Sequence, residues 1–238
     1  MTPENLFNEL HSFFVENADP EIVQKYSRYF KEGYPGYGLA KGLFEQITDS
    51  LLLQPGISLK LVLKTAPLLL NTGKYEETSA LIRLVLHFKK NFRIDTFHEI
   101  EGWFNYGITN WAHTDYLCGD VMWIFFQKEI INMKDLSEWR TAQNKFQRRA
   151  VPVSLIKPMK KTTGSFQPFF DFLDPMMTNP EREVHQGLGW FLREAWKKQP
   201  LPTESFLSKW KNISPRLIFQ YATEKMTKEA KEQFRRER

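Results

Sequence analysis

The sequence predicts an all-α protein, and three observations carry that prediction. Apolar residues recur at the three- and four-residue spacing of one helix face through most of the chain. No stretch alternates apolar and polar residues over a length that would make a useful strand. Breaks rich in glycine and proline separate the periodic stretches, at QPG, NTG, KKTTG, DPMMTNP and KQPLP. Helices of about 10–20 residues joined by short loops permit either a bundle or a solenoid.

The residues at their starts predict the first two helices. Thr2 precedes Pro3, which places a side-chain acceptor at the N-cap and a fixed φ at the first helical position. Asp19 and Pro20 repeat this arrangement before EIVQKYSRYFKEG, and GYPGYG at 33–38 is a turn-rich break. Further helices are expected at about 40–53, 58–71, 75–91, 95–106, 110–129, 136–160, 166–174, 180–198, 203–211 and 214–234.

Length and composition are those of a folded soluble protein. The chain has 238 residues, 42% hydrophobic and 26% charged, which is enough to bury a large core. No run approaches 18 apolar residues, and the N-terminus has acids but no basic region, so we expect neither a membrane span nor a signal peptide. Cys118 is the only cysteine, which excludes an intramolecular disulfide and is typical of the reducing cytosol.

The positive charge is concentrated in the second part of the chain. Residues 1–140 hold 14 Lys and Arg against 18 Asp and Glu, whereas residues 141–238 hold 19 against 10. A basic half favours attraction to polyanions, nucleic acid first. Lysines and arginines that are merely solvated are the ordinary alternative.

The stretch TNWAHTDY, at 109–116, pairs an indole with a carboxylate. Trp111 and Asp115 are four residues apart and share one face of an expected helix. On a groove, this pair would offer a flat apolar platform beside an anion. The competing interpretation of the pair alone places Trp111 in the core and Asp115 at the surface.

Two adjacent arginines follow in SEWRTAQNKFQRRAVPVSLIKPMKK. Arg148 and Arg149 point in different directions from one helix. Arginine suits phosphate because its planar fork pairs with two oxygens, while a solvated helix face is the usual alternative. Pro152 implies either a kink or a helix that begins later than residue 136.

Two glycines precede Trp190 in REVHQGLGWFLREAWKKQP. Gly187 and Gly189 cost helix stability relative to alanine, so we expect another backbone to approach closely there. Arg193 and Glu194 are expected to bridge neighbouring helices, a structural role.

Three of these positions recur at a repeat-like spacing. Trp111, Arg148 and Trp190 lie 37 and 42 residues apart, near the roughly 40–47-residue period of HEAT repeats. That spacing favours equivalent helices of successive repeats, and therefore a solenoid.

Taken together, these stretches resemble the AlkD-type DNA alkylation repair family. The resemblance runs in order through SRYFKEGYPGYGL, the Trp111/Asp115 segment, FQRRAVPVSLI, GLGWFLREAWKKQP and SPRLIFQYATEKM, and GWFLRE is its most specific part. It implies one HEAT-like α-solenoid domain over residues 1–238, with a basic concave face for duplex DNA. It also implies a monomer, located in the bacterial cytosol or nucleoid, and a monofunctional glycosylase that removes N3- and N7-alkylated purines.

The resemblance also assigns roles to individual residues of the expected DNA-binding face. These are Asp115 as the catalytic aspartate, Trp111 and Trp190 flanking the lesion, Arg148 at the DNA backbone, and Tyr29 facing the same groove. Arg149, next to Arg148 in the sequence, is a further candidate for DNA binding.

The chemistry of this reaction suits these residue types. Alkylation at N3 or N7 leaves the purine cationic, so the base is already a good leaving group. A fixed carboxylate stabilises the positive charge that grows on the deoxyribose and orients the attacking water. Indole faces attract a cation by about 0.5–2 kcal/mol each. No metal or cofactor is required, and the five histidines lack ligand spacing.

One departure from the family pattern bears on activity. The family commonly has an acid directly after the first tryptophan, where this chain has Ala112. We interpret the change as loss of a supporting group. The competing function is a catalytically silent HEAT-like scaffold that binds DNA or another protein. A catalytic Asp115 should be partly exposed between the two indoles on a basic concave face, whereas burial of Asp115 in a helix–helix salt bridge would rule out the enzyme.

Overall fold

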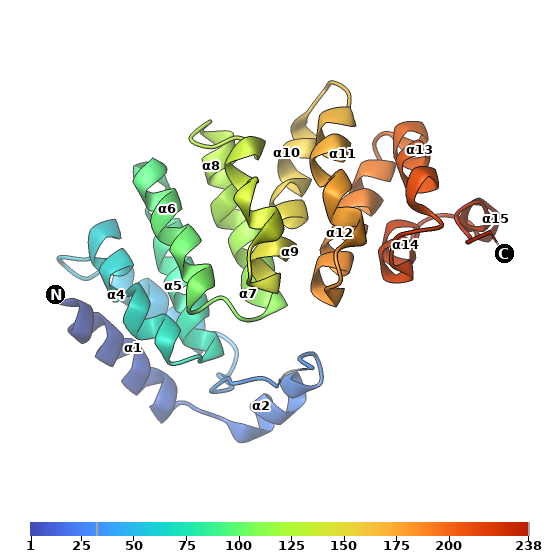
Figure 1. The fold of residues 1–238 in the computed structure, drawn as a ribbon. Coiled ribbons are helices and arrows are strands. Elements are labelled where there is room, and N and C mark those ends of the chain that lie inside the picture. Colours follow the sequence, from blue (N-terminus) through green and yellow to red (C-terminus); the bar gives the residue numbers. More distant parts are fainter. Residues whose placement is uncertain (32, 238) are drawn as a thin grey trace. The chain divides into compact units, whose positions relative to one another are not determined.

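The computed structural model of the chain describes residues 1–31 and 33–237, and every regular element in those ranges is helical (Figure 1). The all-α prediction is therefore confirmed for the described residues. None of their helices is both long enough and apolar enough to cross a membrane. The chain divides into two compact units, Met1–Thr109 and Asn110–Arg238. The single domain and the solenoid stay predictions.

The described residues of the first unit form six α-helices and two short 3-10 turns. The predicted caps of its first two helices are confirmed, because the Thr2 hydroxyl accepts from the Asn5 amide at 3.2 Å and Asp19 accepts from the Glu21 amide at 2.8 Å. The helices are α1 (Pro3–Glu16), α2 (Pro20–Ser27), α3 (Leu43–Leu52), α4 (Leu59–Asn71), α5 (Tyr75–His87) and α6 (Ile94–Gly102), with 3-10 turns at Lys89–Asn91 and Trp103–Asn105.

Helix α2 is shorter than predicted. It ends at Ser27, and the chain continues in tight turns in which the Tyr29 amide donates to the Tyr26 carbonyl at 3.0 Å. The predicted helix extended to residue 33, and residue 32 lies outside the described residues. The GYPGYG break is non-helical as expected, an irregular segment with left-handed backbone at Gly33 and Gly38.

Two buried glutamates at the start of α5 hold that break in place. Glu76 accepts from the amides of Tyr37 at 2.8 Å and Gly38 at 2.9 Å, and Glu77 accepts from the Tyr37 hydroxyl at 2.7 Å. Carboxylates in the first turn also interact favourably with the positive end of the helix dipole.

The second unit contains the other helices. Helix α7 packs on α9, α9 on α12, and α12 on α14, so these four helices are neighbours in series. The helices are α7 (Trp111–Tyr116), α8 (Trp123–Gln127), α9 (Lys145–Ser154), α10 (Ile156–Lys161), α11 (Gln167–Leu173), α12 (Arg182–Trp196), α13 (Pro200–Trp210), α14 (Arg216–Ala222) and α15 (Lys228–Glu232). Between them lie a π-helix at Leu117–Met122 and 3-10 turns at Met133–Leu136, Glu138–Thr141 and Asp174–Thr178.

Two predicted long helices are broken in the structure, and a third is continuous. The segment predicted as 110–129 is helical from Trp111 to Gln127, with a π-helical turn at Leu117–Met122. The segment predicted as 136–160 begins late, at Lys145, because the Asn144 side chain caps the Phe146 amide at 2.8 Å. Of the two alternatives that Pro152 allowed, a kink or a later helix start, the later start is confirmed, and Pro152 lies inside α9. The segment predicted as 214–234 is divided where Thr227 caps α15.

The two glycines of α12 allow the close approach that was expected. A Cβ at Gly187 would lie 3.3 Å from the Arg149 carbonyl oxygen of α9. A Cβ at Gly189 would lie 2.8 Å from the Ile218 carbonyl oxygen and collide with the Tyr221 side chain, both on α14. Glycine at these two positions therefore lets α12 pack tightly against a helix on each side.

Candidate functional site

Helix α7 places Trp111 and Asp115 on one face. Asn110 caps this helix, accepting from the His113 amide at 2.9 Å, and Trp111 is its first residue. His113 and Thr114 are buried on the core side of this helix, whereas Trp111 is 39% exposed. Ala112, in the first turn, is half-buried. The predicted i, i+4 geometry is thus present at the surface of α7.

Asp115 is held by a two-pronged ion pair with Arg149 of α9. Arg149 Nε donates to Asp115 Oδ1 at 2.9 Å, and Arg149 Nη2 donates to Asp115 Oδ2 at 2.8 Å. The third nitrogen of the guanidinium, Nη1, donates to the Glu183 carbonyl oxygen at 2.9 Å. One arginine therefore joins α7, α9 and α12.

The pair is only partly hidden from solvent. The side chain of Asp115 is 18% exposed and that of Arg149 is 7% exposed. A carboxylate has about four acceptor positions, and Arg149 occupies two of them. The arrangement thus includes the helix–helix ion pair that counts against catalysis, together with the partial exposure that catalysis needs.

Burial and pairing act on the Asp115 carboxyl in opposite directions. Removal from water disfavours the charged form and raises its pKa, while the hydrogen bonds and charge of Arg149 act to lower that pKa; burial is the larger effect. The pKa of Asp115 therefore lies above the ordinary aspartate value of 3.8. A carboxylate with a raised pKa is a stronger proton acceptor.

Arg148 is directed away from this pair, as expected for adjacent residues on a helix. Its Nη1 donates to the Ala142 carbonyl at 2.5 Å and to the Gln143 carbonyl at 3.0 Å, and its Nη2 lies 3.1 Å from Glu181. Among the described residues, its buried Nε has no hydrogen-bond partner. Arg148 lines a pocket of about 400 Å³ with Arg140, Thr141, Pro175, Met176, Asn179 and Pro180.

Trp190 and Tyr29 are the other two predicted site residues. Trp190 lies on α12, seven residues or two turns after Glu183, so it shares a stripe with the residue whose carbonyl binds Arg149. Tyr29 belongs to the other compact unit and is 54% exposed, with the Arg28 guanidinium 4.8 Å above its ring. Its place at the same groove stays a prediction.

Two glutamates at the start of α12 were not predicted. Glu181 pairs with Arg148, and Glu183 pairs with Lys145 at 2.9 Å. Although partial burial opposes the change, the Lys145 hydrogen bond and charge hold the pKa of Glu183 below its usual value. The sequence signal that could have indicated them is the pair of acids in PEREV, which lies at the start of a predicted helix.

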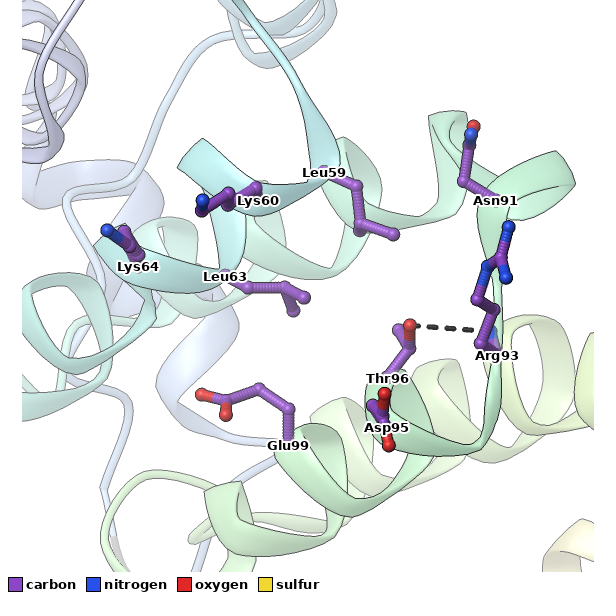
Figure 2. Close-up of a pocket in the computed structure, with 9 residues that line it drawn as sticks. All are labelled: Leu59, Lys60, Leu63, Lys64, Asn91, Arg93, Asp95, Thr96 and Glu99. Atoms are coloured by element: carbon purple, nitrogen blue, oxygen red, sulfur yellow. Dashed lines mark hydrogen bonds between the residues drawn. The ribbon is translucent and has the colours of Figure 1, made fainter.

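Other features of the described residues lie apart from this set. A groove of about 710 Å³ between α4 and α6 has lysines on one wall and acids on the other, and contains none of the predicted site residues (Figure 2). Among residues 1–31 and 33–237, no cluster of three or more His, Cys, Asp or Glu is placed to hold a metal ion.

Comparisons with known proteins found one family model and one solved structure that are similar to the chain. The family model described as DNA alkylation repair enzyme matches residues 10–226. A solved structure, described as a predicted DNA alkylation repair enzyme from Enterococcus faecalis, has a TM-score of 0.71 and 15% identity, over 89% of this chain and 98% of that chain. That similarity is one of fold. No curated protein sequence matches the chain.

Proposed function

The chain belongs to the DNA alkylation repair enzyme family, and from that membership we propose that it is a monofunctional DNA glycosylase. Its substrates are purines alkylated at N3 or N7 in duplex DNA, and it hydrolyses their N-glycosidic bond. It acts as a monomer in the cytosol, without metal or cofactor.

The fixed and partly exposed carboxylate of Asp115 is the observation that supports this proposal most directly. Arg149 orients both carboxylate oxygens, so the charge is held in place before substrate arrives. The acceptor positions that Arg149 leaves open are available to a sugar cation and a water molecule. Trp111, one turn earlier on the same face, offers an exposed indole to a cationic group.

In the proposed reaction the bond from C1′ to the purine breaks first. The electron pair leaves with the alkylated base, which becomes neutral, and positive charge develops on the deoxyribose. Asp115 stabilises that charge and accepts a hydrogen bond from the water that adds to C1′ and loses its proton to solvent. Trp190 flanks the lesion from α12, and Arg148 lies at the DNA backbone. Arg149, which is occupied by Asp115 and the Glu183 carbonyl, positions the acid instead of the strand.

Two observations favour a second candidate, a DNA-binding protein without glycosylase activity. Ala112 removes an acid that the family commonly has beside Trp111. The positive charge of Arg149, 2.8 Å from Asp115, also weakens the field that the carboxylate exerts on a sugar cation.

Release of base from methylated duplex DNA decides between the two. We expect wild type to release 3-methyladenine or 7-methylguanine in the presence of EDTA. The Asp115→Asn variant should lower the single-turnover rate by about 10²–10³-fold, because it removes the stabilising charge, and should leave DNA affinity within a few-fold.

Asp120→Asn is the matched control for this experiment. Asp120 is a half-exposed acid in the adjacent π-helix, 3.4 Å from Lys157, and its loss should leave release unchanged. Wild type that binds DNA but releases no alkylated base contradicts the glycosylase and supports the second candidate.

A further inference from the structure

A basic pocket lies between α14 and α15, near the C-terminal end of the described residues. Its volume is about 510 Å³, within the range of ligand-binding sites. Four cationic side chains and one acidic side chain line it. The residues that line this C-terminal basic pocket are Arg216, Phe219, Gln220, Thr223, Lys228, Lys231, Glu232, Phe234 and Arg235.

Most of the positive charge in this pocket has no carboxylate partner. Arg216 donates to the Phe234 carbonyl at 2.8 Å and lies 4.6 Å above the Phe219 ring, contacts that fix the guanidinium without neutralising it. Lys231 reaches the Glu224 carbonyl at 3.4 Å. Within the described ranges, no ion pair involves Arg216, Lys228 or Lys231, and the one acid, Glu232, pairs with Arg235 at 2.7 Å.

A further cation adds to the same field. Arg236 donates to the Ser214 carbonyl at 3.0 Å. Burial of Arg216 lowers the pKa of its guanidinium, and the nearby charge of Arg236 lowers it further. Like charges held close together by backbone contacts destabilise the protein unless an anion is bound. The local geometry therefore favours an anionic ligand.

The pocket extends beyond the part of the chain that carries the family signal. The family match ends at residue 226, so Lys228, Lys231 and the whole of α15 lie outside it. Its cations come from α14, from α15 and from the turn after α15, and Lys228 and Arg235 are exposed. A spread of exposed cations suits the successive phosphates of a strand.

We propose that the C-terminal basic pocket binds backbone phosphates of DNA, outside the lesion site. The nature of the polymer rests on the proposed function, whereas the affinity for phosphate rests on the pocket alone. Arg216 supplies the planar donor fork that suits a phosphate group, and the two lysines supply mobile point charges.

The salt dependence of binding to undamaged duplex DNA tests this proposal in the full chain. The double variant Lys228→Gln, Lys231→Gln should bind more weakly at low salt. It should also reduce the slope of log K against log salt by about 0.9 for each phosphate that the protein no longer neutralises, so by up to about 1.8. Far-UV circular dichroism and thermal unfolding verify that the variant folds as wild type does.

The matched control is Lys60→Gln, Lys64→Gln, which removes the same charge from two exposed lysines of α4 (Figure 2). A reduced slope for the pocket variant with an unchanged slope for the control supports the proposal. An unchanged slope for the pocket variant overturns it, and so does an equal reduction in both variants, which would reflect net charge alone.

A second arm separates DNA from free phosphate. Inorganic phosphate is titrated into wild type while the backbone amide signals of residues 228–232 are followed by NMR. Saturable shifts there, combined with an unchanged DNA slope for the pocket variant, overturn the DNA assignment in favour of a small phosphate ligand. Because the duplex is undamaged, the slopes are independent of base release, so a wild type that releases no base refutes the proposed function without affecting this result.

Discussion

Asp115 is useful to the proposed reaction only when it is ionised, which ties activity to pH. Burial raises its pKa above the ordinary 3.8, so the charged form is lost on acidification sooner than for an exposed aspartate. Base release should be full well above this raised pKa and fall as pH decreases through it, with a midpoint above 3.8. Single-turnover release across acidic pH, corrected for uncatalysed loss of base from the same DNA, measures that midpoint. A rate that is constant down to pH 3.8 contradicts the role of Asp115.

Removing the partner of Asp115 should destabilise the fold. Arg149→Ala leaves a largely buried carboxylate without its cation and the Glu183 carbonyl without its donor, which costs about 3–5 kcal/mol of unfolding free energy. Chemical denaturation followed by circular dichroism measures this loss. The control, Lys157→Ala, removes an exposed partner 3.4 Å from Asp120 and should cost less than about 1 kcal/mol. Equal losses in the two variants would show that the Asp115 pair is no stronger than a surface contact.

At the scale of elements, the packing of α12 on α14 depends on the absence of a side chain at Gly189. Gly189→Ala places a Cβ against the Ile218 carbonyl and the Tyr221 side chain and should lower the unfolding free energy by about 1–3 kcal/mol. Gly102→Ala is the control, because its Cβ would meet no atom within 4 Å near the end of α6, and it should be neutral or slightly stabilising. Thermal unfolding compares the two, and a Gly189→Ala variant as stable as wild type would contradict the close packing.

The helices themselves were largely predictable, because their signals are local. Caps such as Thr2 and Asp19 and the periodic apolar faces act within a few residues of each other. The π-helical turn and the start of α9 after Asn144 were not predicted, because the periodic apolar pattern that predicts a helix marks neither feature. Likewise, adjacency in sequence gave no means of telling which of Arg148 and Arg149 reaches Asp115; only the packing of α7 on α9 selects Arg149.

At the scale of the whole molecule, charge and candidate site residues occur together. Residues 110–238 hold 22 Lys and Arg against 15 Asp and Glu, whereas residues 1–109 hold 11 against 13. The second unit also contains Asp115, both arginines and both tryptophans of the candidate site. Only Tyr29 lies in the first unit. The net charge that favours DNA therefore comes from the unit that holds the proposed chemistry.

The ion pair between Asp115 and Arg149 also has a consequence for evolution. Because the loss of either partner leaves the other buried and unpaired, selection for a stable fold keeps both, whether or not the protein acts on DNA. A protein with this fold and no glycosylase activity would therefore still carry this aspartate. An aspartate at this position is therefore expected from the packing of α7 on α9 alone, and its presence does not distinguish a glycosylase from a protein that only binds DNA.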